Sequence, residues 1–181
     1  MWKTSRKSVG WTFFLVLLGV ASLDQWTKHL VVNHLMLYQS IPLKKGWLNL
    51  VYVHNTGMAF GLFNGPGNLP KTLFFSGVTL VAVLVVFYFL AHAIRNRDRG
   101  QAALLGMIGG GTIGNLCDRF HSGSVIDFID VYYRHYHWPA FNVADAAISV
   151  GVILLILQLL FRRSRERQEG EQDASRSVSY R

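Results

Sequence analysis

The chain alternates between long apolar runs and shorter polar segments. The first run, residues 10–23, continues after a short polar break with more apolar residues. A helix over about 11–32 would be roughly 30 Å long, which is enough to cross a bilayer. Three further apolar segments of helical length follow, at 69–94, 101–120 and 143–161. The pattern predicts four transmembrane helices.

The N-terminus also resembles a secretory signal peptide, because Lys3, Arg6 and Lys7 precede the first apolar run. The apolar residues beyond the polar break favour a retained first span instead. Within that break, Asp24 and Lys28 are four residues apart, which predicts an ion pair on one helix face. Two readings of this pair stay open: an anchor for the helix end, or a group near an active site.

The segment 33–68 is typical of loop and strand. Residues 47–53 are rich in β-branched and aromatic residues and too short to span as a helix, which favours a strand. The glycines and proline of 65–67 indicate a turn, and we expect 121–139 to be a loop. The predicted fold class is an all-α membrane protein: four transmembrane helices with a small extracytoplasmic β platform and loop.

The third predicted helix is thin, because small residues replace bulky ones along it. Such residues let helices approach closely in lipid; here they are Gly106, Gly109, Gly110, Gly111 and Gly114. Gly111, Asn115 and Arg119 are spaced by four residues, so they lie on one helix face.

Composition supports a single membrane domain. Of the 181 residues, 51% are hydrophobic and only 15% are charged, unlike a typical soluble domain. We assign residues 1–162 to a single four-helix transmembrane domain. Residues 163–181 are polar and charged, which predicts a disordered cytoplasmic tail.

The positive charges cluster at the ends of apolar runs. Twelve of the 18 Lys and Arg residues lie before the first helix, in the connector 95–99 or in the tail. By the positive-inside rule both termini are cytoplasmic and both long loops face outward, in a multi-pass membrane protein. The formal charge of +8 therefore reflects topology, and no nucleic-acid partner is expected.

The stretch 115–145 holds the candidate chemistry. Asp127 and Asp145 fall where a polar loop meets a predicted span, and carboxylates at such a boundary suggest function. If the two carboxyls face each other, they share a proton, and the pair supplies a general base and a general acid. Alternatives stay open: Asp145 as a third-position residue of a helix capped by Asn142, and Asp127 as an ion-pair partner of Arg119.

Other hydrolytic sites lack the residues they need. The sequence has no GxSxG or HExxH motif, and its single cysteine, Cys117, excludes an internal disulfide or a cysteine-based metal site. His135 and His137 have no accompanying ligand set, so we expect no metal. An aspartic mechanism is the hydrolytic class that the residues allow.

Five short motifs together resemble one family. They stand in its order along the chain, at 23–28 (LDQWTK), 55–61 (NTGMAFG), 111–119 (GTIGNLCDR), 125–128 (VIDF) and 141–145 (FNVAD). The set is similar to that of the bacterial lipoprotein signal peptidase family, also called signal peptidase II, and the match covers about residues 10–162.

The resemblance implies an aspartyl endopeptidase that removes signal peptides from diacylglyceryl-modified prolipoproteins, cleaving before the lipidated cysteine. It implies Asp127 and Asp145 as the catalytic pair. It also implies a set of residues that line the site: Asn55, Gly111, Asn115, Arg119 and Asn142. No metal or organic cofactor is expected. The implied partners are the lipid bilayer, the prolipoprotein and a globomycin-type inhibitor, and we expect a monomer.

Two other classes compete with this reading. A small proton-coupled membrane transporter would need acidic residues deep in several spans, yet 72–94 and 146–161 contain none. A non-catalytic membrane assembly factor would leave Asp127 and Asp145 replaceable.

Overall fold

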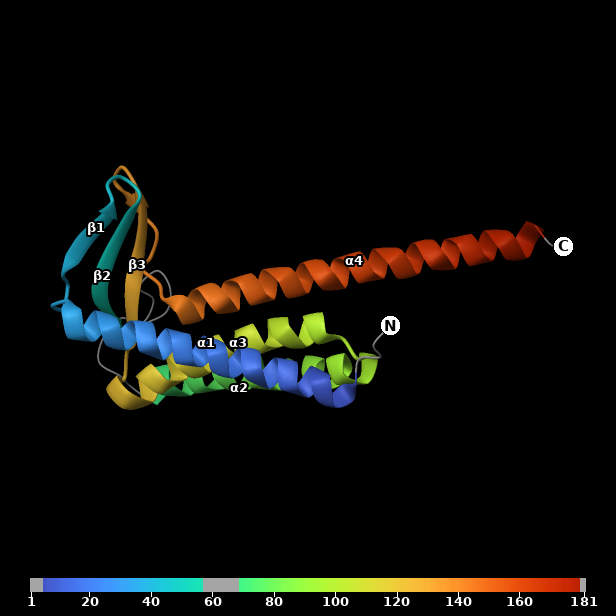
Figure 1. The fold of residues 1–181 in the computed structure, drawn as a ribbon, viewed down its shortest axis with the longest axis horizontal. Coiled ribbons are helices and arrows are strands. Elements are labelled where there is room, and N and C mark those ends of the chain that lie inside the picture. Colours follow the sequence, from blue (N-terminus) through green and yellow to red (C-terminus); the bar gives the residue numbers. More distant parts are fainter. Residues whose placement is uncertain (1–4, 57–68, 180–181) are drawn as a thin grey trace.

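The computed structural model describes residues 5–56 and 69–179 as a helical bundle with a small sheet at one end (Figure 1). The elements, in chain order, are α1 (Arg6–His34), β1 (Ser40–Lys44), β2 (Leu48–Asn55), α2 (Leu69–Asn96), α3 (Arg99–Ser122), β3 (Val125–Tyr133), β4 (Tyr136–His137) and α4 (Val143–Ser179). Residues 57–61 of the second motif and the turn expected at 65–67 lie outside the described residues.

Helix α3 is the centre of the bundle, because α1, α2 and α4 each make their most extensive helix–helix contact with it. Its glycines permit this packing. A Cβ at Gly106 would lie 2.7 Å from the carbonyl oxygen of Phe13, and a Cβ at Gly110 would lie 2.5 Å from that of Leu17. The backbones of α1 and α3 can therefore approach only because these positions carry no side chain.

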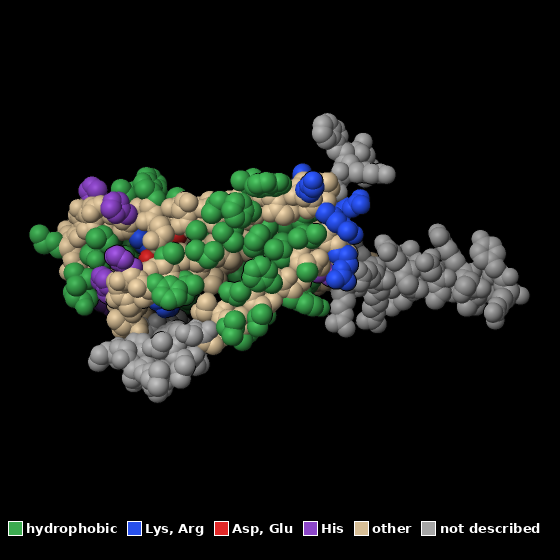
Figure 2. All heavy atoms as spheres, turned by 90° about the horizontal axis from the view of Figure 1, so that it is seen from below, with side chains coloured by type: hydrophobic (Ala, Val, Ile, Leu, Met, Phe, Trp, Pro, Cys, Tyr) green, Lys and Arg blue, Asp and Glu red, His purple; other side chains and the backbone are tan. Residues whose placement is uncertain are grey.

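Three helical segments are long and apolar enough to cross a membrane: Arg6–His34, Gly77–Asn96 and Val143–Arg162. Large hydrophobic side chains stay exposed along them, as expected for helices that face lipid, and Figure 2 shows these side chains covering the flank of the bundle. Helix α3 is not among the three within the described part of the chain. The expectation of a membrane protein is met, while the predicted fourth span stays a proposal.

The sheet is antiparallel, in the order β1-β2-β3-β4. The strand expected at 47–53 is present as β2. The expectation of a loop over 121–139 was wrong in part, because its middle part, Val125–Tyr133, forms the nine-residue strand β3. The reason is visible in the sequence: 125–133 (VIDFIDVYY) is rich in β-branched and aromatic residues.

Helix α4 runs on as helix to Ser179, far beyond the apolar segment (Figure 1). This differs from the disordered tail predicted from residue 163 onward. A helix that is already formed removes the nucleation cost for the residues that follow, and Arg, Glu and Gln in 163–172 favour helix. The described backbone is helical here, while a separate tail and the division into two parts at 162/163 stay predictions.

We predict that Gly110→Ala lowers the free energy of unfolding by about 1–3 kcal/mol, because the added Cβ would meet the backbone of α1. Gly19→Ala is the matched control, since a Cβ at Gly19 meets nothing within 4 Å, and it should be neutral or slightly stabilising. Thermal unfolding in detergent measures both. Equal melting temperatures for the two variants would contradict the close α1–α3 contact.

Candidate active site

Asp127 and Asp145 come from different elements and share one neighbour. Asp127 lies on β3, and Asp145 lies in the first turn of α4. Asn142 Nδ2 donates to Asp127 Oδ1 (2.8 Å), and the backbone N–H of Asn142 lies 3.3 Å from Asp145 Oδ2, which accepts from it. A single residue therefore holds both carboxyls, and the fold brings together the pair that the sequence proposed.

The start of α4 fixes Asp145 through local hydrogen bonds. The side-chain oxygen of Asn142 accepts from the backbone N–H of Asp145 (2.9 Å), while the Asp145 carboxylate reaches back to the Asn142 N–H. This reciprocal pair is a capping box, with Asn142 at the N-cap and Asp145 three residues on. The helix-capping alternative for Asp145 and its place beside Asp127 are therefore compatible.

Two further amides orient the carboxyls. Asn55 Nδ2 donates to Asp127 Oδ2 (2.9 Å), so both oxygens of Asp127 accept a hydrogen bond from an amide. Asn115 Nδ2 donates to Asp145 Oδ1 (2.7 Å). The Asn142 side chain also contacts Asn115 Oδ1 (3.2 Å). The amides form one connected network around the acid pair.

Asp127 is 2% exposed. The pKa of its carboxyl is raised to about 7, mainly by burial and also by the nearby charge of Asp145, while the hydrogen bonds from Asn55 and Asn142 act in the opposite direction. Desolvation dominates because a low-dielectric site disfavours the ionised form. At neutral pH a substantial fraction of Asp127 therefore holds a proton.

A buried cluster of charges lies next to the amides. Lys28, which is 1% exposed, bonds Asp24 Oδ2 (2.7 Å) and Asp118 Oδ2 (2.7 Å). Its third contact is with Asn115 Oδ1 (3.0 Å). The ammonium thus has a partner for each of its three protons, and the ion pair expected between Asp24 and Lys28 is confirmed.

This cluster also holds the backbone beside each catalytic candidate. Asp24 Oδ1 accepts from the N–H of Ala144 (2.9 Å), the residue before Asp145. Asp118 Oδ2 accepts from the N–H of Ile126 (3.2 Å), the residue before Asp127. Helices α1 and α3 therefore set the positions of both carboxyl-bearing segments.

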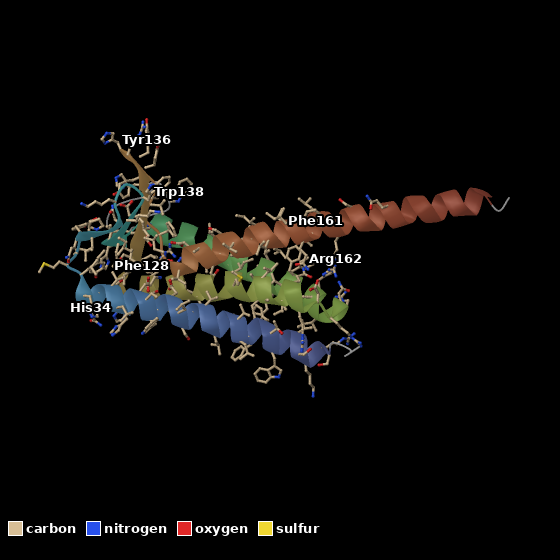
Figure 3. All side chains as sticks on the ribbon, turned by 45° about the horizontal axis from the view of Figure 1, so that its top comes forward. His34, Phe128, Tyr136, Trp138, Phe161 and Arg162 are labelled. Carbon is tan, nitrogen blue, oxygen red and sulfur yellow. The ribbon has the colours of Figure 1, made fainter. Side chains whose placement is uncertain are left out.

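A groove of about 1100 Å³ leads to the site. Apolar side chains of α2, α3 and α4 line most of it, and Asn55, Asn115, Arg119 and Asp145 line its polar part. Trp138 borders the groove and lies at the sheet end of the molecule (Figure 3). The arrangement gives an apolar ligand a path to a half-buried carboxyl.

Arg119 supplies the positive charge on this wall. It interacts electrostatically with Asp145, Asp127 and Asp118. The sequence suggested an ion pair of Arg119 with Asp127 alone, whereas the charge of Arg119 acts on all three of these carboxyls.

Gly111 takes a different place from the other predicted residues. A Cβ there would lie 2.5 Å from the carbonyl oxygen of Ala144 and 2.8 Å from Ile148 Cγ1. Gly111 thus lets α3 approach the first turn of α4 and thereby positions Asp145. The structure brings Asn55, Asn115 and Asn142 directly to the carboxyls.

Sequence reasoning missed the size of the charged cluster. It found Asp24 and Lys28, but not Asp118 as the second partner, nor Gln25, whose Nε2 donates to Asp118 Oδ1 (2.8 Å). A signal was present: Asn115 and Asp118 are three residues apart, so both can reach the same neighbouring helix.

The histidines of the sheet have ordinary partners. His137 Nδ1 lies 2.9 Å from Asp130 Oδ1, and its ring stacks on Tyr132 with centroids 4.9 Å apart. Among the residues that the structure describes, no group of three or more His, Cys, Asp or Glu side chains is placed to hold a metal ion.

Comparison with known proteins decides the family. The family model described as signal peptidase (SPase) II matches residues 16–161. The chain belongs to the signal peptidase II family. This aspartic-type peptidase family is the one that the five motifs indicated, so the assignment as an enzyme is confirmed.

Individual relatives of this signal peptidase II chain are similar over most of their length. The lipoprotein signal peptidase of Syntrophus aciditrophicus is 42% identical over 84% of the chain and 95% of the relative. That of Geobacter sulfurreducens is 43% identical, over 85% and 94%. A solved bacterial membrane enzyme matches with a TM-score of 0.73 and 30% identity, covering 85% of this chain and 90% of its own.

We predict that Lys28→Met lowers the free energy of unfolding by about 3–5 kcal/mol, because it leaves buried carboxylates without their cation. Lys44→Met on the exposed strand β1 is the matched control and should change stability little. Denaturant titration in detergent measures the difference. Equal free energies of unfolding for Lys28→Met and its control would contradict the positioning role of the cluster.

Proposed function

We propose that the chain removes signal peptides from diacylglyceryl-modified prolipoproteins, cleaving before the lipidated cysteine, with Asp127 and Asp145 as the catalytic pair. The observation that carries this proposal is the shared contact with Asn142, which holds Asp127 beside Asp145, the carboxyl that lines the apolar groove. The family and its relatives named lipoprotein signal peptidase support the reaction.

The two carboxyls take different roles. Asp145 lines the groove and acts as the base that removes a proton from water. Asp127 is buried and has a pKa raised to about 7, so it holds the proton that the carbonyl oxygen or the leaving amine needs. This division of roles follows from the different environments of the two carboxyls: one is buried, and the other lines the groove.

The supporting residues hold the pair and the substrate. Asn55, Asn115 and Asn142 donate to the carboxyls. Arg119 lines the groove and steadies the substrate backbone or the developing negative charge. Gly111, which contacts the first turn of α4, keeps Asp145 within reach. No cofactor takes part in this scheme.

The groove suits a substrate that arrives through the membrane. Its apolar side chains come from α2, α3 and α4, so the diacylglyceryl chains and the signal helix of a prolipoprotein can stay in apolar surroundings while the scissile bond reaches Asp145. A globomycin-type inhibitor would occupy the same groove, and the enzyme acts as a monomer.

The distribution of positive charge supports an orientation with the site near the outer face. Lys and Arg side chains gather at the end of the bundle away from the sheet (Figure 2), and Arg162, midway along α4, lies level with that end (Figure 3). By the positive-inside rule this end and both termini are cytoplasmic. The glycine-rich α3 is the fourth span, enclosed by the other helices.

The proton-coupled transporter finds no support in the comparisons, whose matches are lipoprotein signal peptidases. In the structure, the acidic residues of the site gather beside one groove at one end of the bundle, which is poor geometry for a relay across the membrane.

We expect Asp127→Asn and Asp145→Asn each to lower the cleavage rate of a lipidated prolipoprotein peptide by about 10²–10⁴-fold, because each removes one partner of the acid–base pair. Purified enzyme in detergent is assayed. Asp130→Asn, on the same strand but bonded to Asn49 and His137, is the control and should stay active. Full activity of either catalytic-pair variant would refute the mechanism.

A further inference from the structure

A second, smaller pocket lies on the other face of β2. Its volume is about 320 Å³, and it is lined by residues from α1, α3, β2 and β3. Tyr52 and His54 line this pocket, whereas Asn55 lines the groove. Successive side chains of a strand point to opposite faces, so His54 and Asn55 lie back to back.

His54 links β2 to the beginning of β3. Its Nδ1 lies 2.6 Å from the hydroxyl of Ser124, and its Nε2 lies 2.9 Å from the hydroxyl of Tyr52. Ser124 is buried and directly precedes Val125, the first residue of β3 and the residue that pairs with Asn55. The imidazole therefore joins the two strands at the pair nearest to the site.

The end of β2 needs a side-chain link to β3, because strand ends open more easily than strand centres. Strand β2 ends at Asn55, and only Gly123 and Ser124 separate α3 from β3. Ser122 Oγ adds a bond to the carbonyl oxygen of Ser124 (3.0 Å), which ties the same junction to α3. The His54–Ser124 bond thus completes a connection from α3 through β3 to β2.

We propose that His54 is a positioning residue for catalysis: through its bond to Ser124 it holds Asn55 in place to donate to Asp127. The proposal rests on the proposed function, and it adds a residue that does not touch the carboxyls. The groups that face His54 across the pocket are Lys28 and His29 of α1, Cys117, Asp118 and His121 of α3, and Tyr52 of β2.

The consequence is a specific change in pH dependence. The hydrogen bond from Asn55 favours ionised Asp127 and lowers the pKa of its carboxyl. When Asn55 is no longer held, that pKa rises, so the protonated acid persists to higher pH. The alkaline limb of kcat/KM then moves upward, by about one pH unit if the bond is lost.

The test is the pH profile of peptide cleavage by purified variants. His54→Phe and Ser124→Ala should each shift the alkaline limb upward by about one pH unit and lower kcat more than they change KM. His54→Asn should restore most of the wild-type profile, because its amide can take the place of Nδ1. Tyr52→Phe removes only the bond at Nε2, and its limb should stay in place.

Asn55→Ala gives the reference shift, since it removes the donor itself. The proposal is overturned if Ser124→Ala and His54→Phe leave the limb unmoved, or lose activity without moving it. If His54→Phe does not fold, Ser124→Ala alone decides. Different results would refute the proposed function itself: no cleavage of the peptide by the wild-type enzyme, or cleavage by Asp127→Asn at the wild-type rate.

Discussion

The contacts of one buried ammonium group organise this molecule. Lys28 bonds Asp24, Asp118 and Asn115 at 2.7–3.0 Å. The two carboxylates accept from the backbone beside Asp145 and beside Asp127. Charges buried this deeply are costly unless every partner is present, so the cluster forms only when α1, α3, α4 and β3 are in register. The geometry of the acid pair is therefore a property of the whole bundle.

The apolar surroundings give the pair its chemistry. Burial raises the pKa of Asp127 to about 7, although two amides stabilise its ionised form. Asp145 differs, because it lines a groove that opens between the helices. A membrane setting helps both features: lipid-facing helices keep the site in a low dielectric, and the same groove admits a substrate whose signal helix is already in the bilayer.

Much of the molecule could be predicted from the sequence. The apolar runs located all four helices, although α4 continues well beyond its apolar segment. The placement of Asp127 and Asp145 at span boundaries made them the leading candidates for an acid pair. Strand β3 was missed because two aspartates interrupt its apolar pattern. The continuation of α4 beyond residue 162 was not predicted, because composition says little about whether a formed helix runs on. The positions of Asp118, His54 and Ser124 depend on contacts between segments distant in sequence, which spacing alone does not reveal.

The most direct test follows the proton on Asp127. Infrared difference spectra between wild type and Asp127→Asn, recorded across the pH range, show the carboxyl group as it ionises. We expect this signal to disappear near pH 7, with a midpoint that belongs to the pair. Because the folded pKa is raised, the proton is held below that pH and lost above it. Ionisation close to 3.8, the ordinary value for the group, would contradict a buried, proton-sharing pair.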